Sequence, residues 1–333
     1  MPAPLTPALL VLVLLNLIFA YFSGIADTAN IVAPVISSRA IRPQFAVLLA
    51  AGAALAAPLL FGVAVARTFG VGVLLPAAAG PHTVLAATFS ATLWRLITWW
   101  WNVPASSSHG VVGGLVGAGL AAGGLPAVNL EGLGRVLLAL FVSPLAGLLA
   151  GFIITGLLYA LAERATPRIN NLFRLSQVFT ALVLALSWGA NDAQKAIGLL
   201  ALGVAAVTGA SFDIPLWVSV AAMGATALGG LTGGSRLIRK LGGKFYRIRP
   251  IHGLAAQLAA AGVSFAATAV GAPVSTTQVV STTILGAGAA QRLNMVRWGV
   301  AAEIVWAWVL TVPATVALGA LGVWALRWLP FFA

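Results

Sequence analysis

Long apolar runs, broken only by short polar gaps, constrain the fold of this chain more than any other feature of its sequence. Such runs cover approximately residues 5–22, 45–66, 136–161 and 300–324, with others between them. Residues are 61% hydrophobic and only 7% charged, whereas about 25% of a soluble domain's residues carry charge. Soluble and disordered classes are therefore excluded. The sequence predicts an all-α polytopic membrane protein embedded in the lipid bilayer as one unit.

The net charge of +12 belongs to loops rather than to a nucleic-acid site. Basic residues fall mostly in the gaps between apolar runs, as the positive-inside rule expects of cytoplasmic loops. The gap at residues 236–249 is basic without a single acid and is predicted to be cytoplasmic. With Arg39 and Arg42 also inside, the amino terminus would lie outside. The chain has no cysteine, which excludes disulfides, thiolate metal sites and thiol nucleophiles.

Two polar islands interrupt apolar sequence. In residues 187–195 the charged members are Asp192 and Lys195, and an isolated carboxylate at membrane depth costs roughly 2.5 to 3.5 kcal/mol. In residues 23–30, Asp27 and Asn30 share a helix face at i, i+3 spacing. Asp27 as the cap of a helix end is the alternative, but apolar sequence continues beyond it. Both islands therefore indicate functional sites.

Each island is followed by a proline and a run of hydroxyl residues that opens an apolar helix. The runs are Ser106, Ser107 and Ser108 after Pro104, and Ser275, Thr276 and Thr277 after Pro273. Free backbone amides and side-chain hydroxyls at a helix start suit an oxyanion. A plain helix cap at the membrane surface is the alternative.

The order and spacing of these elements repeat. Asp27 precedes Pro104 by 77 residues, and Asp192 precedes Pro273 by 81. Duplicated halves with polar breaks at matching positions are typical of transporters, whose sites lie where broken helices meet. We therefore expect two inverted repeats, residues 1–165 and 166–333, around one cavity. Two carboxylates would repel an oxyanion in a low dielectric, so a cation or proton would have to enter with it.

Between the first island and the first hydroxyl run, residues 82–101 are expected to be a less regular stretch that contains Arg95. Tryptophans gather at the headgroup level of a membrane, so the Trp cluster of this stretch is predicted to mark an interface. Its members are Trp94, Trp99, Trp100 and Trp101. An aromatic cage for a cation is the alternative.

At the islands and hydroxyl runs the chain resembles the bacterial members of the inorganic phosphate transporter (PiT) family. Residues 189–198 are similar to the second signature of that family, and residues 24–30 with 37–43 are similar to the first. The Pro104 and Pro273 elements match as well, so the resemblance covers essentially the whole chain. It implies about ten to twelve membrane helices in two inverted repeats, with two re-entrant helical hairpins, and a homodimer.

The resemblance also implies roles for individual residues. The hydroxyl residues of both runs would bind phosphate close to the two aspartates. The residues that would couple transport to Na⁺ or H⁺ are Asp27, Asn30, Asn191 and Asp192. Neither a metal cofactor nor a catalytic residue is expected.

Two departures from the family pattern bear on the coupling ion. Where the full pattern would read Asn-Asp-x-x-Asn in each half, this chain has Ala26 before Asp27 and Lys195 three residues after Asp192. Each change removes an oxygen ligand, and Lys195 can place a positive charge where sodium would otherwise sit. We therefore favour H⁺ modestly over Na⁺, with a Lys195 that points away as the alternative. Gln194 and His109 are also expected to modulate the site.

The sequence thus predicts a symporter that imports inorganic phosphate, alone or as a metal-phosphate complex, across the inner (plasma) membrane by alternating access. Sulfate or another tetrahedral oxyanion is the alternative substrate, although a protonated phosphate oxygen can donate to Asp27 or Asp192 and ionised sulfate cannot. A membrane-embedded hydrolase is disfavoured, because adjacent Ser108 and His109 do not project toward each other as a catalytic pair must. A passive channel would show flux without coupling.

Overall fold

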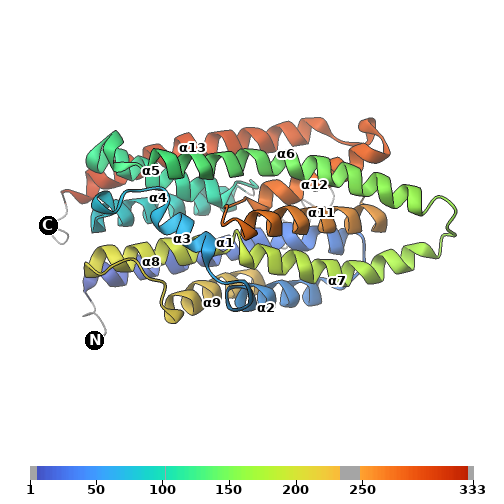
Figure 1. The fold of residues 1–333 in the computed structure, drawn as a ribbon, viewed down its shortest axis with the longest axis horizontal. Helices are drawn as coiled ribbons and strands as arrows, with labels where there is room; N and C mark the ends of the chain where they lie inside the picture. The colour runs from blue at the N-terminus through green and yellow to red at the C-terminus, as the bar shows by residue number, and fades with distance from the viewer. Residues whose placement is uncertain (1–5, 102, 233–247, 329–333) are drawn as a thin grey trace.

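Long helices form almost all of the structure, a computed structural model that describes residues 6–101, 103–232 and 248–328. Apart from short 3₁₀ turns and one isolated antiparallel bridge between Leu74 and Val128, the regular structure of these residues is α-helical (Figure 1). The helices are α1 (Pro7–Ser37), α2 (Pro43–Phe61), α3 (Ala64–Val71), α4 (Pro81–Trp100), α5 (Ser107–Gly123), α6 (Leu130–Leu161), α7 (Ile169–Ala190), α8 (Gln194–Thr208), α9 (Leu216–Thr232), α11 (Pro250–Ala269), α12 (Thr276–Gln291) and α13 (Trp298–Leu326).

Within the described residues, 6 helical segments are long and apolar enough to cross a membrane. They are α1, α2, α6, the segment Ile169–Thr208 that takes in α7 and α8, α11 and most of α13. Large apolar side chains such as Leu138 and Phe141 are exposed along α6, as Trp306 and Leu310 are along α13. A surface of this kind is solvated by lipid. The predicted all-α polytopic membrane class is confirmed.

Two helical hairpins occupy opposite ends of the molecule. Figure 1 shows α6 and α13 running along most of the long axis, whereas α4 and α5 lie toward one end and α11 and α12 toward the other. The turns at Pro104 and at Pro273 bring the hairpins together, since the Ser108 hydroxyl oxygen lies 3.3 Å from the Val274 carbonyl oxygen. The helix starts of α5 and α12 are therefore buried next to each other.

The halves of the chain interleave. Helix α5 packs on α13 while α12 packs on α6, and α1 packs on α9 while α2 packs on α7. Small residues permit the close approach: a Cβ on Gly117 of α5 would lie 2.0 Å from the Val316 carbonyl oxygen, and one on Gly151 of α6 would lie 2.3 Å from that of Thr283. Membrane helices associate through such small-residue contacts, because lipid removes the hydrophobic drive between helices.

The two polar islands fold differently. Helix α1 continues through Asp27 to Ser37, well beyond the span expected to end near Phe22, whereas the chain breaks at residues 191–193 between α7 and α8. Asp27 therefore lies in the interior of a helix and is not a cap. Asp192 lies in the break, where its backbone carbonyl is free to accept the Lys195 ammonium at 2.7 Å.

One local prediction is wrong, because residues 81–100 form the regular helix α4 rather than a less regular stretch. Its polar side chains do not disrupt it, since the hydroxyls of Thr88, Thr92 and Thr98 each donate to a carbonyl one turn back, at 2.8, 2.7 and 2.9 Å. Trp94 donates to Thr311 of α13 and leaves the exposed Trp100 and Trp101 at the helix end. The interface role of these tryptophans stays a prediction.

The basic loop predicted at residues 236–249 lies outside the described residues except for residues 248–249. Arg249 immediately precedes α11, and its backbone amide donates to the His252 ring nitrogen Nδ1 at 3.4 Å. Its cytoplasmic location stays a prediction.

Gly151→Ala should destabilise the protein, because the new Cβ would lie 2.3 Å from the Thr283 carbonyl oxygen and would force α6 and α12 apart. We expect a loss of about 1 to 3 kcal/mol, seen as a lower melting temperature in detergent. Gly156→Ala on the same helix is the matched control, since nothing lies within 4 Å of its new Cβ. Equal melting temperatures for the two variants would contradict the close α6–α12 packing.

Candidate functional site

Asp27 is the first centre of a buried polar cluster. Its Oδ1 accepts from the Arg95 guanidinium at 2.5 Å, and its Oδ2 lies 3.4 Å from the Lys195 ammonium. The Ser107 hydroxyl donates to the same Oδ2 at 3.3 Å. Helices α4, α5 and α8 thus each contribute one group to this carboxylate of α1.

Asp192 is the second centre. Its Oδ1 accepts from Lys195 at 2.5 Å and from the Ser108 hydroxyl at 2.6 Å. Its Oδ2 accepts from the backbone amide of Thr276 at 3.1 Å. An anionic oxygen at the start of α12 is stabilised by the free amides and the dipole of the helix. Asp192 therefore occupies a position that would also suit an oxyanion.

Lys195 connects the two aspartates, and the alternative in which it points away is therefore wrong. The ammonium contacts both carboxylates, and only 1% of the side chain is exposed. The cluster contains two acidic and two basic residues, Asp27, Asp192, Arg95 and Lys195. When all four are ionised their charges cancel, and a buried charge is tolerated only when it is paired in this way.

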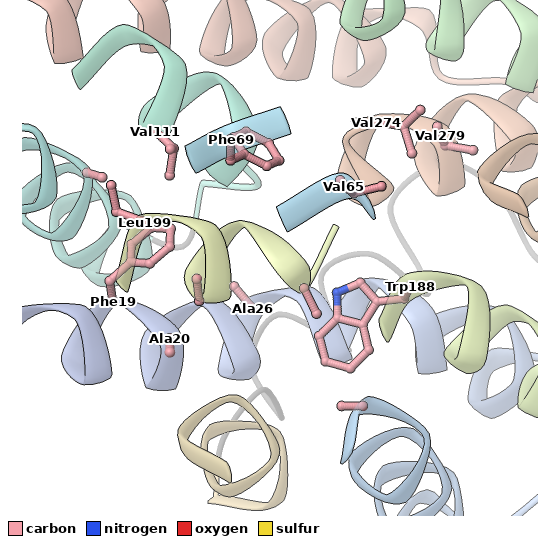
Figure 2. Packing of buried hydrophobic residues seen from close by; sticks show 14 of the residues in the cluster. Phe19, Ala20, Ala26, Val65, Phe69, Val111, Trp188, Leu199, Val274 and Val279 are labelled. Atoms are coloured by element: carbon pink, nitrogen blue, oxygen red, sulfur yellow. The ribbon is translucent and has the colours of Figure 1, made fainter. Parts of the chain in front are cut away.

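Apolar side chains surround the cluster. Figure 2 shows one buried apolar group to which several helices contribute. Its members include Ala26 of α1, Val65 and Phe69 of α3, Trp188 of α7, and Val274 and Val279 of the second hairpin. Trp188 is completely buried. A low-dielectric surrounding strengthens every charge interaction inside it, so a change of one charge in the cluster has a large energetic effect.

The structure brings together most of the predicted hydroxyl residues. Ser107 and Ser108 donate to the two aspartates, and Thr277 accepts from Asn30 at 2.8 Å. The Thr276 hydroxyl is buried without a partner among the described residues, and Ser275 is buried at the start of α12. All of these groups lie at the paired hairpin starts.

Ser106 acts as the cap of α5, which the sequence left as the alternative for the whole run. Its hydroxyl oxygen accepts from the His109 amide at 3.2 Å and lies 2.7 Å from the His109 ring nitrogen Nδ1. The Ser106–His109 contact is local, between residues three apart at one helix start, and among the described residues no carboxylate contacts His109 to complete a Ser–His–Asp arrangement. The geometry therefore offers no support for a hydrolase.

The two asparagines predicted to handle a cation lie in different settings. Asn30 uses its amide nitrogen on Thr277, and its Oδ1 is buried without a partner among the described residues. Asn191 accepts from the Val274 amide at 2.9 Å and donates to Ala272 at 3.0 Å, so it holds the turn of the second hairpin. Their part in cation coupling stays a prediction.

Gln194 lies beside the cluster but is directed away from it. Its Oε1 accepts from the Ala66 amide at 3.0 Å, and its Nε2 donates to the Gly62 carbonyl at 2.6 Å. Both contacts fix the connection between α2 and α3 against the start of α8. Gln194 can modulate the site only through the position of Lys195.

Sequence reasoning did not assign Arg95 to the site, although it is as buried as the aspartates. Its guanidinium also donates to the carbonyls of Ser23 and Ala105, at 3.3 and 3.2 Å, and so links α1 to the first hairpin turn. A signal was present, because Thr88, Thr92 and Arg95 recur at i, i+4 and i+7 and define one polar face of a helix. The neighbouring tryptophans hid this pattern.

Apolar helices surround a buried, charge-balanced polar site, and two hairpins reach this site from opposite ends. These features define a polytopic membrane transporter. The chain belongs to the phosphate transporter family, whose sequence profile matches residues 23–319. The predicted family is therefore confirmed, and the chain is a transporter rather than an enzyme.

Relatives extend the match over nearly the whole chain. The probable low-affinity inorganic phosphate transporter of Rhizobium meliloti is 39% identical over 318 residues, which cover 95% of each chain. That of Bacillus subtilis is 37% identical over 323 residues, or 96% of this chain and 97% of the relative. A solved structure described as the sodium-dependent phosphate transporter superposes with a TM-score of 0.87 at 25% identity, over 97% of this chain and 99% of that one.

Arg95→Met should strongly destabilise the protein, because the buried Asp27 carboxylate would lose its nearer cationic partner and keep only Lys195, at 3.4 Å. Loss of one partner from a buried ion pair costs about 3 to 5 kcal/mol, and we expect a correspondingly lower melting temperature in detergent. The double variant Arg95→Met/Asp27→Leu should recover part of that loss.

Arg135→Met is the matched control for this cycle, since its pair with Glu131 is 77% exposed on both sides. Exposed pairs contribute about 0 to 1 kcal/mol. If Arg95→Met were no more harmful than Arg135→Met, the charge balance assigned to the cluster would be wrong.

Proposed function

We propose that this transporter imports inorganic phosphate together with protons, by alternating access around the cluster of Asp27, Asp192, Arg95 and Lys195. The observation that carries the proposal is the position of Lys195, whose ammonium contacts Asp27 at 3.4 Å and Asp192 at 2.5 Å. An ammonium between the two carboxylates competes with a sodium ion for the same oxygens. It leaves proton binding as the available means of changing the charge of the site.

Phosphate would bind where the two hairpins meet. The hydroxyls of Ser107 and Ser108 now donate to carboxylates and can rotate toward a bound anion. The unpaired Thr276 hydroxyl, the amides at the start of α12 and the Lys195 ammonium complete a donor set from both halves. A tetrahedral oxyanion needs donors from several directions, and this arrangement provides them.

Charge balance supplies the coupling. The ionised cluster is neutral, so phosphate would add uncompensated negative charge to a low-dielectric interior. As phosphate takes the donors of Lys195, Ser108 and the Thr276 amide, Asp192 loses its partners, and a buried carboxylate without partners takes up a proton. When phosphate leaves, the original pairs re-form and the proton is released. Phosphate and proton therefore cross together.

This chemistry also favours phosphate over sulfate, the alternative substrate. A protonated phosphate oxygen can donate to Asp27 or to the buried Asn30 Oδ1, which has no partner among the described residues. Ionised sulfate offers only acceptors and would leave the Asn30 Oδ1 unsatisfied, a cost of about 1 to 3 kcal/mol for a buried group. The family assignment agrees with phosphate.

Sodium coupling is the second candidate, favoured by the description of the structural neighbour as sodium-dependent. In this chain Ala26 precedes Asp27, and Lys195 follows Asp192 by three residues. The unpaired Asn30 Oδ1 remains as one ligand, but Na⁺ would have to displace the Lys195 ammonium from both aspartates. We therefore retain proton coupling as the proposal.

We also propose that residues 1–165 and 166–333 are the two inverted repeats that rock against each other. The matched packing pairs, α5 with α13 and α12 with α6, support this division. The turns after α1, α6 and α12 contain basic residues, namely Arg39, Arg42, Arg164, Arg168, Arg292 and Arg297. By the positive-inside rule that end would face the cytoplasm, with the amino terminus outside the inner (plasma) membrane.

Homodimer formation and transport of a metal-phosphate complex remain proposals from the family resemblance.

Radiolabelled phosphate uptake into proteoliposomes should follow an imposed proton gradient without sodium and should resist excess unlabelled sulfate. The lumen should acidify as phosphate enters, as an entrapped pH-sensitive dye would record. A protonophore is the control, because it collapses the gradient without touching the protein. Uptake that requires sodium and proceeds without acidification would replace H⁺ with Na⁺, and uptake blocked by sulfate would change the substrate.

Lys195→Asn should make transport responsive to sodium, because it removes the ammonium and supplies an amide oxygen next to Asp27 and Asp192. Uptake by this variant is expected to rise with a sodium gradient and to lose most of its dependence on the proton gradient. Lys195→Arg is the matched control and should keep the proton dependence. Unchanged sodium and pH dependence in the asparagine variant would contradict the role of Lys195.

A further inference from the structure

Helix α1 carries a polar stripe that extends beyond the phosphate site. At 100° per residue, Asn16, Ser23, Asp27 and Asn30 fall on one side of the helix, roughly a quarter turn from Gly24, which packs on Thr226 of α9. Asn16 precedes Asp27 by three helical turns, or about 16 Å along the axis. The stripe therefore runs from the site toward the membrane face at which α1 begins.

Asn16 is the most unusual member of this stripe. Its side chain is completely buried, and neither its Oδ1 nor its Nδ2 has a partner among the described residues. The Ser23 hydroxyl and the Arg95 Nε are likewise buried and unpaired in the described part of the chain. Buried amides and hydroxyls are costly unless they are hydrogen-bonded, and buried water is the usual partner where protein provides none. Intramembrane polar residues of this kind mark ion and proton pathways.

The neighbouring helices continue the stripe. The Thr92 hydroxyl of α4 donates to the Leu15 carbonyl at 3.2 Å, one residue from Asn16. Arg95, one turn further along α4, donates to the Ser23 carbonyl at 3.3 Å. Polar groups of α4 thus contact α1 at both ends of the interval from Asn16 to Asp27. On the α8 side Leu12 packs against Gly203, because a Cβ there would lie 2.3 Å from the Leu12 side chain.

We propose that Asn16 and Ser23 bind a file of buried waters that conducts protons between the membrane face at which α1 begins and Asp27. From there Lys195, which contacts both carboxylates, relays them by donating one proton to Asp192 and accepting another from Asp27. Each water accepts one proton and donates another, so none is consumed. The inference rests on the proton coupling proposed above. The charged groups that face Asp27 are Arg95 from α4, Lys195 from α8 and, through Lys195, Asp192 from the α7–α8 break.

The file is interrupted in this conformation. Leu12 and Phe19, one turn on either side of Asn16, are 0% and 1% exposed, and Phe19 belongs to the same buried cluster as Leu199 of α8 (Figure 2). Movement of α8 relative to α1 would open or close the file at these residues. Proton access would then change in the same step as the conformation, which prevents a proton leak.

The second half of the chain differs at the matching position. Eleven residues before Asp192, as Asn16 is before Asp27, lies Ala181, which offers water no hydrogen bond. Buried hydroxyls do occur on α7, but Thr180 donates to Gln257 and Ser187 to the Leu184 carbonyl, so both have protein partners. The unpaired amide of Asn16 therefore favours the α1 side as the route of proton entry.

The test compares Asn16→Leu with Asn16→Ser in proteoliposomes that contain an entrapped pH-sensitive dye and receive radiolabelled inorganic phosphate. Leucine fills the site without polar atoms and should slow proton-driven uptake and acidification by about tenfold or more, while serine keeps a hydroxyl for water and should retain most of both. Phosphate binding measured without a gradient should be unchanged in both variants. The melting temperature of Asn16→Leu should not fall, because leucine removes an unpaired buried amide.

Thr155→Val is the matched control, since it removes a completely buried hydroxyl from α6, away from the stripe, and should leave uptake unchanged. Wild-type uptake rates in Asn16→Leu, or an equal loss of phosphate binding and uptake, would overturn the water file. A wild-type protein that imports phosphate without acidification would instead overturn proton coupling itself. The two failures are therefore distinguishable.

Discussion

Four ionisable side chains lie together in the interior of a protein whose outer surface is apolar. Asp27 and Asp192 can stay ionised there because Arg95 and Lys195 cancel their charge within hydrogen-bonding distance. In a low dielectric neither a lone carboxylate nor a lone ammonium would be tolerated. Every element that contributes a member is therefore tied to the others. Helices α1, α4 and α8 and the break after α7 must assemble together for any of these charges to be stable.

The same constraint explains how binding of an anion can be coupled to protonation of a carboxylate. A balanced cluster in a dry site has no spare positive charge, so any arriving phosphate takes donors from a carboxylate. Lys195 is the pivotal donor, since it contacts Asp192 through both the carboxylate and the backbone carbonyl. The hairpin starts add directional donors that move with the two halves of the chain. Electrostatic balance, rather than shape alone, thereby links substrate binding to conformation.

Much of this arrangement could be predicted from the sequence because membrane sequences have few polar residues. The two aspartates stood out from apolar surroundings, and the order of islands and hydroxyl runs identified the elements that meet. Arg95 could not be assigned with the same ease, because adjacent tryptophans suggested a membrane interface and obscured its helical spacing from Thr92. The direction of Lys195 also needed the structure, since the break at residues 191–193 decides which way the start of α8 faces. Asn16 stands as a lone polar residue in the first apolar run, but its significance depends on the partners it lacks among the described residues, which the sequence does not show.

The central claim is that phosphate displaces the aspartates from donors they hold in this structure. A cryo-electron microscopy structure of the protein with phosphate tests it most directly. The account predicts phosphate between the starts of α5 and α12, in contact with Lys195 and with the hydroxyls of Ser108 and Thr276, and an Asp192 carboxylate separated from Lys195. Phosphate bound elsewhere, with the Lys195–Asp192 pair still at its present 2.5 Å, would contradict it.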